Sequence, residues 1–292
     1  MEKRQRRIVN YAISWIGGIE MIDVHTHIGR YVKDRKPLTA ELLISTMDKW
    51  GIEKSVILPL ENPEEGDYYV TTEYVLSECE KYPNRLIPFC NVDPRRGMPG
   101  WDPYPVIKEY KERGCKGFGE CLFGLPIDDP RACRLYAACG ALGLPVLHDI
   151  RYRYIDYDKP GLPGLERVLS QYPNTVFIAH GPAWWSEISA EVDPTVGYPT
   201  GKVKPGGRVD ILLDKYENLY ADISAYSGYN ALTRDPEFGI KFLERHHDKL
   251  LFGTDYIFAG QELNDCPKAI VDYIKKADIS TKTFRAITRE NT

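Results

Sequence analysis

Short apolar stretches rich in β-branched residues alternate along this chain with longer stretches in which apolar residues recur every three or four positions. The first pattern predicts strands and the second predicts amphipathic helices, because side chains alternate faces in a strand and return to one face about every 3.6 residues in a helix. The expected strands are Met21–His27, Lys54–Pro59, Leu86–Val92, Cys115–Glu120, Pro145–Asp149, Thr175–His180, Leu219–Ile223 and Leu250–Asp255. The expected helices are Thr39–Trp50, Thr71–Tyr82, Tyr104–Arg113, Pro130–Leu142, Leu162–Gln171, Arg208–Lys215, Pro236–His246 and Asp265–Ala277.

Strict alternation of eight strands with eight helices predicts an α/β fold closed as a (β/α)8 TIM barrel. The chain has 292 residues, which suits such a barrel, because about 250 residues are needed to close one. We therefore expect an N-terminal extension over residues 1–20 and a single barrel domain over residues 21–292. An open doubly wound sheet is the alternative, but no G-x-G-x-x-G motif follows the first expected strand.

One connecting segment stands out. Residues Ala183–Gly207 lack clear periodicity and are rich in Pro, Gly and Trp. Long connections inside a compact domain tend to be functional, so this segment is a candidate lid or specificity loop.

Histidines gather at the ends of the expected strands. The chain has six, and four of them close strands one, five and six: His25 and His27, then His148, then His180. Residues two apart on a strand share a face, so His25 and His27 can hold one ion together. Active sites of such barrels form at the carboxyl ends of the strands, so position and residue type agree.

Two carboxylates complete the set, because Glu120 ends strand four and Asp255 ends strand eight. Alone, either could cap the following helix, and a lone strand histidine is more often a hydrogen-bonded core residue. All six groups at the same end of five strands instead predict one or two divalent ions with a position open for water. Zn²⁺ is the expected ion, and Mn, Fe or Ni accept the same donors.

Four motifs carry a family resemblance: IDVHTHIG, PVLHD, FIAHGP and LLFGTDY. They resemble the amidohydrolase superfamily, and within it the amidohydrolase-related (amidohydrolase 2) group that includes metal-dependent decarboxylases. The resemblance implies that His25, His27 and Asp255 bind metal, that His148 fills the strand-five ligand position, and that His180 is a ligand or a catalytic base. Many binuclear relatives have a carboxylated lysine where this chain has Glu120, and the GFGE segment also resembles TatD-type phosphoesterases.

This pattern predicts a metal-dependent hydrolase. The cation would lower the pKa of water toward neutrality, Asp255 would take its proton, and His180 would polarise the scissile carbonyl. Glu120 and His148 would hold a second ion or secure the first. Expected substrate-binding residues are Arg151 and Tyr152, which could recognise a carboxylate, and Trp184 and Trp185, which could wall an aromatic ring, although such residues often only coat surfaces or pack.

The expected reaction is cleavage of a C–N or C–O bond in a small amide, ester, lactone or cyclic compound. One alternative is a metal-dependent decarboxylase of an unsaturated or aromatic acid, for which Arg151 is the obvious cationic clamp. Another is a TatD-like binuclear phosphoesterase, favoured if two ions share Glu120. A barrel used only for binding would have no reason to keep six metal-ligating groups together.

Composition narrows the partners. The net charge of −4 gives no case for a nucleic acid, so we expect a small-molecule substrate, and a homo-oligomer is compatible with the sequence. No apolar run reaches the roughly 18–20 residues that span a bilayer. Seven cysteines without a CxxC pair suit reduced thiols in a cytoplasmic enzyme. The basic, then mildly apolar start resembles a secretory signal only weakly, because no A-x-A site follows it.

Overall fold

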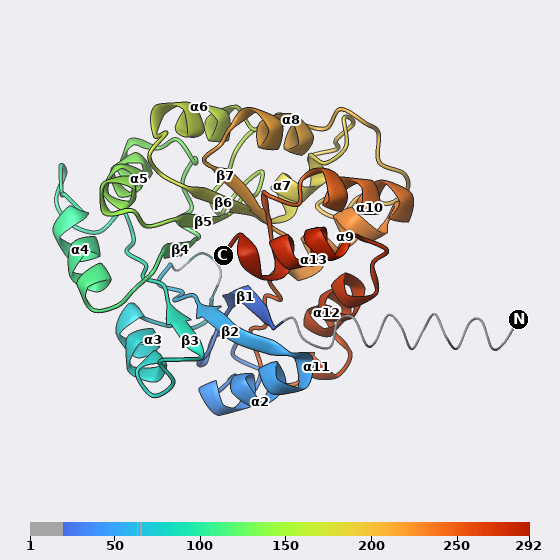
Figure 1. The fold of residues 1–292 in the computed structure, drawn as a ribbon. Helices are drawn as coiled ribbons and strands as arrows, with labels where there is room; N and C mark the ends of the chain where they lie inside the picture. Colours follow the sequence, from blue (N-terminus) through green and yellow to red (C-terminus); the bar gives the residue numbers. More distant parts are fainter. Residues whose placement is uncertain (1–19, 63, 65) are drawn as a thin grey trace, which may run out of the picture.

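The computed structural model describes residues 20–62, 64 and 66–292. The extension expected over residues 1–20 therefore lies, apart from Glu20, outside the described residues. Within the described part the chain forms eight parallel strands in the expected order (Figure 1). They are β1 (Met21–Thr26), β2 (Ile52–Ile57), β3 (Leu86–Pro88), β4 (Phe118–Cys121), β5 (Val146–Asp149), β6 (Phe177–His180), β7 (Leu219–Asp222) and β8 (Leu250–Leu251).

The strands close into a barrel. Pairing is continuous from β1 to β3 and from β4 to β8. Short parallel bridges join the two groups, Cys90 with Phe118 on one side and Thr26 with Tyr256 on the other. Backbone hydrogen bonds of 2.9 Å run from Gly119 N to Cys90 O and from Val24 N to Phe252 O. The predicted TIM barrel is confirmed.

All eight expected helices are present, with ends shifted by at most three residues. They surround the strands in Figure 1 and are α2 (Ala40–Trp50), α3 (Thr72–Cys79), α4 (Tyr104–Glu112), α5 (Pro130–Leu142), α6 (Pro163–Gln171), α8 (Arg208–Lys215), α10 (Pro236–Arg245) and α12 (Cys266–Lys276). Local chemistry sets their ends. Thr39 caps α2 by accepting a hydrogen bond from Leu42 N at 3.2 Å, and Gly51 ends it in the left-handed region at φ 70°.

Further helical segments lie where no helix was expected: α7 (Pro182–Ser186), α9 (Ala225–Thr233), α11 (Gln261–Asn264), α13 (Thr281–Arg285) and the π-helical turn η1 (Ala286–Glu290). Strand β8 is also shorter than expected, because only Leu250 and Leu251 pair with β7. The backbone leaves the extended conformation by Asp255, which has a φ of 55°. The residues between Leu251 and Asp255 include a glycine and a threonine and carry no strong strand signal, so packing against neighbouring elements sets their backbone conformation.

Two apolar layers hold the barrel. Seven buried residues from six strands and their ends meet inside it: Val24, Val56, Leu58, Phe89, Leu147, Ile178 and Leu251. A larger cluster packs the helices onto the outside of the strands. This inside–outside alternation decides which polar residues reach the mouth. Among the described helices, none is long and apolar enough to cross a bilayer.

Candidate metal centre

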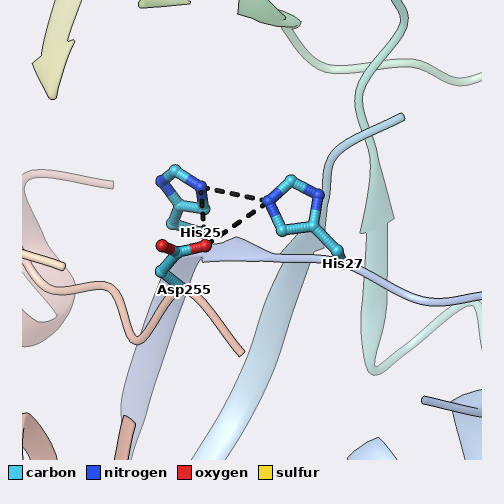
Figure 2. A group of neighbouring side chains, drawn as sticks. All are labelled: His25, His27 and Asp255. Carbon is cyan, nitrogen blue, oxygen red and sulfur yellow. Dashed lines mark hydrogen bonds and ion pairs between the residues drawn. The ribbon is translucent and has the colours of Figure 1, made fainter. Parts of the chain in front are cut away.

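The two histidines of the first strand meet at the barrel mouth. His25 and His27 are buried, and their Nε2 atoms lie 3.2 Å apart. Figure 2 shows both rings and the carboxylate of Asp255, which comes from the segment after β8, turned toward one another. One possible ligand atom from each of the three residues lies within 4.8 Å of the other two.

Two carboxylates complete a compact donor set. Glu120 Oε2 lies 3.5 Å from Nε2 of each histidine, and Asp255 Oδ1 lies 3.4 Å from that of His25 and 3.6 Å from that of His27. Donors at about 2.0–2.2 Å from a tetrahedral ion lie about 3.3–3.6 Å apart, because the edge of a tetrahedron is about 1.6 times its centre-to-corner distance. The spacing of the two histidines from each other and from either carboxylate therefore fits donors of one tetrahedral ion.

His180 joins the same centre from β6. Its ring centroid lies 4.6 Å from that of His25, and one donor atom each of His25, Glu120 and His180 fall within 4.8 Å of one another. Its Nδ1 lies 3.2 Å from Ser224 Oγ. Five of the six expected ligands thus come together, and His180 is placed beside the four-donor cluster rather than inside it.

A residue that the sequence reasoning missed orients both of these histidines. Asp222, at the end of β7, is fully buried, and its Oδ2 lies 2.6 Å from His25 Nδ1 and 3.2 Å from His180 Nδ1. An Nδ1–H that donates to Asp222 leaves the Nε2 lone pair of each ring for an ion. The sequence did contain a signal for Asp222: it is a carboxylate at the end of an expected strand, as Glu120 and Asp255 are.

The electrostatics of the cluster favour a bound cation. Burial alone would lower the pKa of His25, but the nearby carboxylates of Glu120, Asp255 and Asp222 raise it well above its usual value. Burial likewise opposes ionisation of Glu120, yet His25 and His27 hold its pKa well below the usual range. With the imidazoles neutral, as metal ligation requires, the three carboxylates leave an excess of negative charge that a divalent ion would balance.

His148 does not join this centre. Its ring lies on the outer side of β5, against Tyr136 at 5.1 Å and Phe177 at 6.1 Å between centroids, and its Nδ1 lies 2.8 Å from Asp156 Oδ2. The expectation that it ligates the same ion, or a second one beside it, is corrected here, because Leu147 faces the barrel interior and its neighbour must face away. With Cys121 and Asp156, His148 forms a separate buried group of possible ligands.

The next residue along β5 occupies the inward position instead. Asp149 lines a cavity of about 270 Å³ to which the donor cluster contributes His27, Glu120 and Asp255. The cavity is lined by His27, Tyr31, Leu60, Glu120, Asp149, Arg151, His180, Pro182, Tyr198, Ala225, Ser227, Asp255 and Ile257. Its size suits a small molecule, since pockets for drug-sized ligands begin at about 300 Å³.

Of the four expected substrate-binding residues, one lines the cavity and three do not. Arg151 lines the cavity. Tyr152 does not, because its hydroxyl is held by Ser186 at 2.9 Å and Glu187 at 3.0 Å. Trp184 and Trp185 are buried in the core on α7, and the Trp185 indole donates to Asp222 O at 3.0 Å. These three positions are corrected: the tryptophans pack behind the site and do not wall it.

The long segment after β6 nevertheless reaches the cavity. Its base is closed by a 2.9 Å hydrogen bond from Ala190 N to Lys204 O. Between these residues, Tyr198 extends to the cavity wall and stacks edge-on with Tyr226 of α9 at 5.1 Å. A tyrosine, rather than the two tryptophans, is therefore the aromatic residue that this segment contributes.

A family model described as amidohydrolase matches residues 22–292. The chain belongs to the amidohydrolase family. It is thus a family enzyme with a candidate His/Asp metal site, as the four motifs indicated. No curated protein matches the chain.

Solved structures share the barrel. An uncharacterized TIM-barrel protein from Bordetella bronchiseptica is 16% identical, with a TM-score of 0.68 over 94% of this chain and 96% of that one. A probable 2-pyrone-4,6-dicarboxylic acid hydrolase from Acinetobacter baumannii is 16% identical, with a TM-score of 0.62 over 94% and 97%. The manganese-containing 5-carboxyvanillate decarboxylase of Novosphingobium aromaticivorans is 15% identical, with a TM-score of 0.60 over 94% and 96%. At these identities the likeness establishes the fold alone.

Proposed function

We propose that this chain is a metal-dependent hydrolase that cleaves a C–N or C–O bond in a small amide, ester, lactone or cyclic compound. One observation carries the proposal: the Nε2 atoms of His25 and His27 lie 3.2 Å apart, and each lies 3.4–3.6 Å from a carboxylate oxygen of Glu120 and of Asp255. Donors around a tetrahedral ion have such spacings, and His27, Glu120 and Asp255 line a small cavity. Zn²⁺ suits this histidine and carboxylate set, and Mn²⁺ is the ion bound by one structural relative.

The residues divide the chemistry among them. His25, His27, Glu120 and Asp255 would hold the ion, which when bound lowers the pKa of water toward neutrality and polarises an oxygen of the substrate. Asp255 faces the cavity and is the base that takes the proton of the attacking water and returns it to the leaving group. His180, held through its Nδ1 by Asp222 and Ser224, would stabilise the developing oxyanion as an imidazolium, whose Nε2–H is the donor.

The cavity also suggests what the substrate carries. Among the described residues that line it, Arg151 has the one permanent positive charge. A guanidinium recognises a carboxylate through two parallel hydrogen bonds. Structural relatives have been solved with carboxylic acids, namely citric acid, 2,6-dihydroxybenzoate and a nitrobenzoic acid. We therefore favour a small substrate with a carboxylate at one end and the scissile bond at the other.

Decarboxylation is the second candidate, because decarboxylases of aromatic acids share this fold and Arg151 would hold the departing carboxylate. Phosphoester hydrolysis would require two ions that share Glu120. A second ion would have to be held by Glu120 and His180, since the one Nε2 lone pair of His25 serves the first ion and its Nδ1 contacts Asp222.

Metal analysis followed by product analysis separates these reactions. Purified protein is assayed for bound Zn, Mn, Fe and Ni, then incubated in H₂¹⁸O with panels of lactones, amides, phosphoesters and aromatic acids. Hydrolysis places one ¹⁸O in the organic product, whereas decarboxylation releases CO₂ and leaves the organic product unlabelled. Protein that binds metal yet turns over only aromatic acids, with no ¹⁸O in the product, would replace the hydrolase by the lyase. Turnover of phosphoesters alone would favour a binuclear phosphoesterase.

A further inference from the structure

Arg151 is held in place by a residue two positions before it. Its Nε and Nη2 lie 3.1 Å and 2.8 Å from Asp149 Oδ2. Asp149 is 3% exposed and the arginine side chain is 36% exposed, so a buried carboxylate supports a partly open guanidinium at the cavity wall. A long arginine side chain loses much rotamer freedom when it binds, and a fixed partner removes part of that cost in advance.

The backbone makes room for this carboxylate at one glycine. Gly181 follows His180 with a φ of 101°, and a Cβ atom there would lie 2.1 Å from Asp149 Oδ1. No residue with a side chain fits that position without displacing Asp149.

The backbone of Arg151 is fixed as well. Its N–H donates to Asp156 O and its carbonyl accepts from Asp158 N, both at 2.9 Å. The buried Asp156 carboxylate is in turn held by His148 Nδ1 and by Phe123 N, each at 2.8 Å. His148 therefore acts on the cavity only at a distance, by securing the loop that carries Arg151.

We infer that Asp149 is a positioning residue that presents the Arg151 guanidinium as the carboxylate-recognition group of this cavity. The inference rests on the proposed function in one respect, that the ligand is a small carboxylate. Asp149 would act through Arg151, because its Oδ2 accepts from that guanidinium, and its own charge disfavours a second anion nearby.

Because Asp149 is itself negatively charged, the direction in which its neutralisation changes carboxylate affinity tests its role. If Asp149 positions Arg151, neutralising it weakens carboxylate binding although the cavity becomes more positive. If Asp149 is only a neighbouring charge, the same substitution strengthens carboxylate binding.

The experiment compares benzoate with benzamide, which share a shape but differ in charge. Binding of each to Zn²⁺-loaded protein is measured by ligand-observed NMR titration, with bound metal quantified in every sample. The wild type is expected to prefer benzoate. Asp149→Asn should weaken benzoate binding by about tenfold, the effect of one charge-assisted hydrogen bond, and leave benzamide unchanged.

A matched control exists in the chain. Asp129 binds Arg131 with the same spacing, at 2.9 Å, on the exposed start of α5. Asp129→Asn should leave both affinities unchanged, since asparagine also caps a helix. Arg151→Gln should reduce the preference for benzoate further than Asp149→Asn does, and it gives the full loss against which Asp149→Asn is compared.

Unchanged or tighter benzoate binding by Asp149→Asn, or an undiminished benzoate preference in Arg151→Gln, would overturn the inference. So would a wild type that binds both probes equally. None of these measurements needs turnover. A protein that hydrolyses nothing yet shows the expected pattern would refute the proposed function and leave the role of Asp149 intact.

Discussion

Strands β1 and β5 end in similar residues but send them to different places. On β1, Val24 packs inside the barrel and the next residue, His25, still reaches the mouth, because pairing with β2 is irregular between Asp23 and Thr26. On β5, all four residues pair in register with β6, so Leu147 faces inward and His148 outward. The face that a strand presents at its end therefore decides whether a histidine there can become a ligand.

The largest expected difference between the two strands concerns metal content. His25→Ala with His27→Ala removes two of four closely spaced donors, so bound metal should fall from about one ion per chain to background while far-UV circular dichroism stays native. His148→Asn should keep full metal content. Inductively coupled plasma mass spectrometry measures both variants. A double variant with full metal, or a His148→Asn variant without it, would reverse the assignment of the two strands.

The next effect concerns the carboxylate that completes the β1 site. Asp255→Asn retains the shape of the side chain but cannot accept a proton, so kcat should fall by about 10²- to 10⁴-fold while KM changes little. The assay uses saturating metal, so that weakened ligation does not contribute. An unchanged kcat would remove Asp255 as the base, and a change confined to KM would assign it to substrate binding.

A smaller effect is expected at Asp222, which touches His25 and His180 without reaching the cavity. Asp222→Asn should weaken metal binding by about 10- to 100-fold, because the Nδ1–H of His25 loses a charged acceptor. Competition with a chromogenic chelator measures the affinity. Ser224→Ala removes a neighbouring hydroxyl but keeps the carboxylate, and serves as the control. Equal affinities in wild type and Asp222→Asn would show that Asp222 is merely structural.

The smallest expected effect on the metal lies at the outer side of β5. His148→Asn breaks a buried contact with Asp156 and should lower the free energy of unfolding by about 1–3 kcal/mol without changing metal affinity. Thermal denaturation of metal-loaded protein, with Tm lower by several degrees, would show this. His246→Asn, which breaks a 2.6 Å contact with Asp210 far from the cavity, is a matched buried-histidine control and should behave alike. A loss of metal affinity in His148→Asn alone would connect the outer group to the centre.

The fold was predictable because its signals are local and repeated. Each helix from α2 to α12 that was expected has its own apolar stripe, and several have caps that the sequence displays, such as Thr39 and Gly51. Helix α9 and the short β8 were not anticipated, because Ala225–Thr233 and the residues after Leu251 lack a clear period and take their shape from what surrounds them.

The site was predictable where several strands supplied the same kind of residue at the same end. That convergence identified His25, His27, Glu120, His180 and Asp255, since a closed parallel barrel brings such ends together. The sequence reasoning missed Asp222, Asp149 and Tyr198, although the first two end strands in the same way. On β5 it chose His148 as a site residue and not Asp149. In the segment after β6 it chose the two tryptophans as the aromatic wall and not Tyr198.

Residue type, order and period by themselves determined the alternating barrel, the end at which the chemistry gathers and the donors available to an ion. Tertiary structure alone decided which face each strand end presents, since a shift of one residue exchanges inside and outside and depends on pairing with the neighbouring strand. It also decided that Asp149 and not His148 faces the cavity, and that Tyr198 and not Trp184 closes it. Those choices depend on packing between segments far apart in the chain, and no local pattern records them.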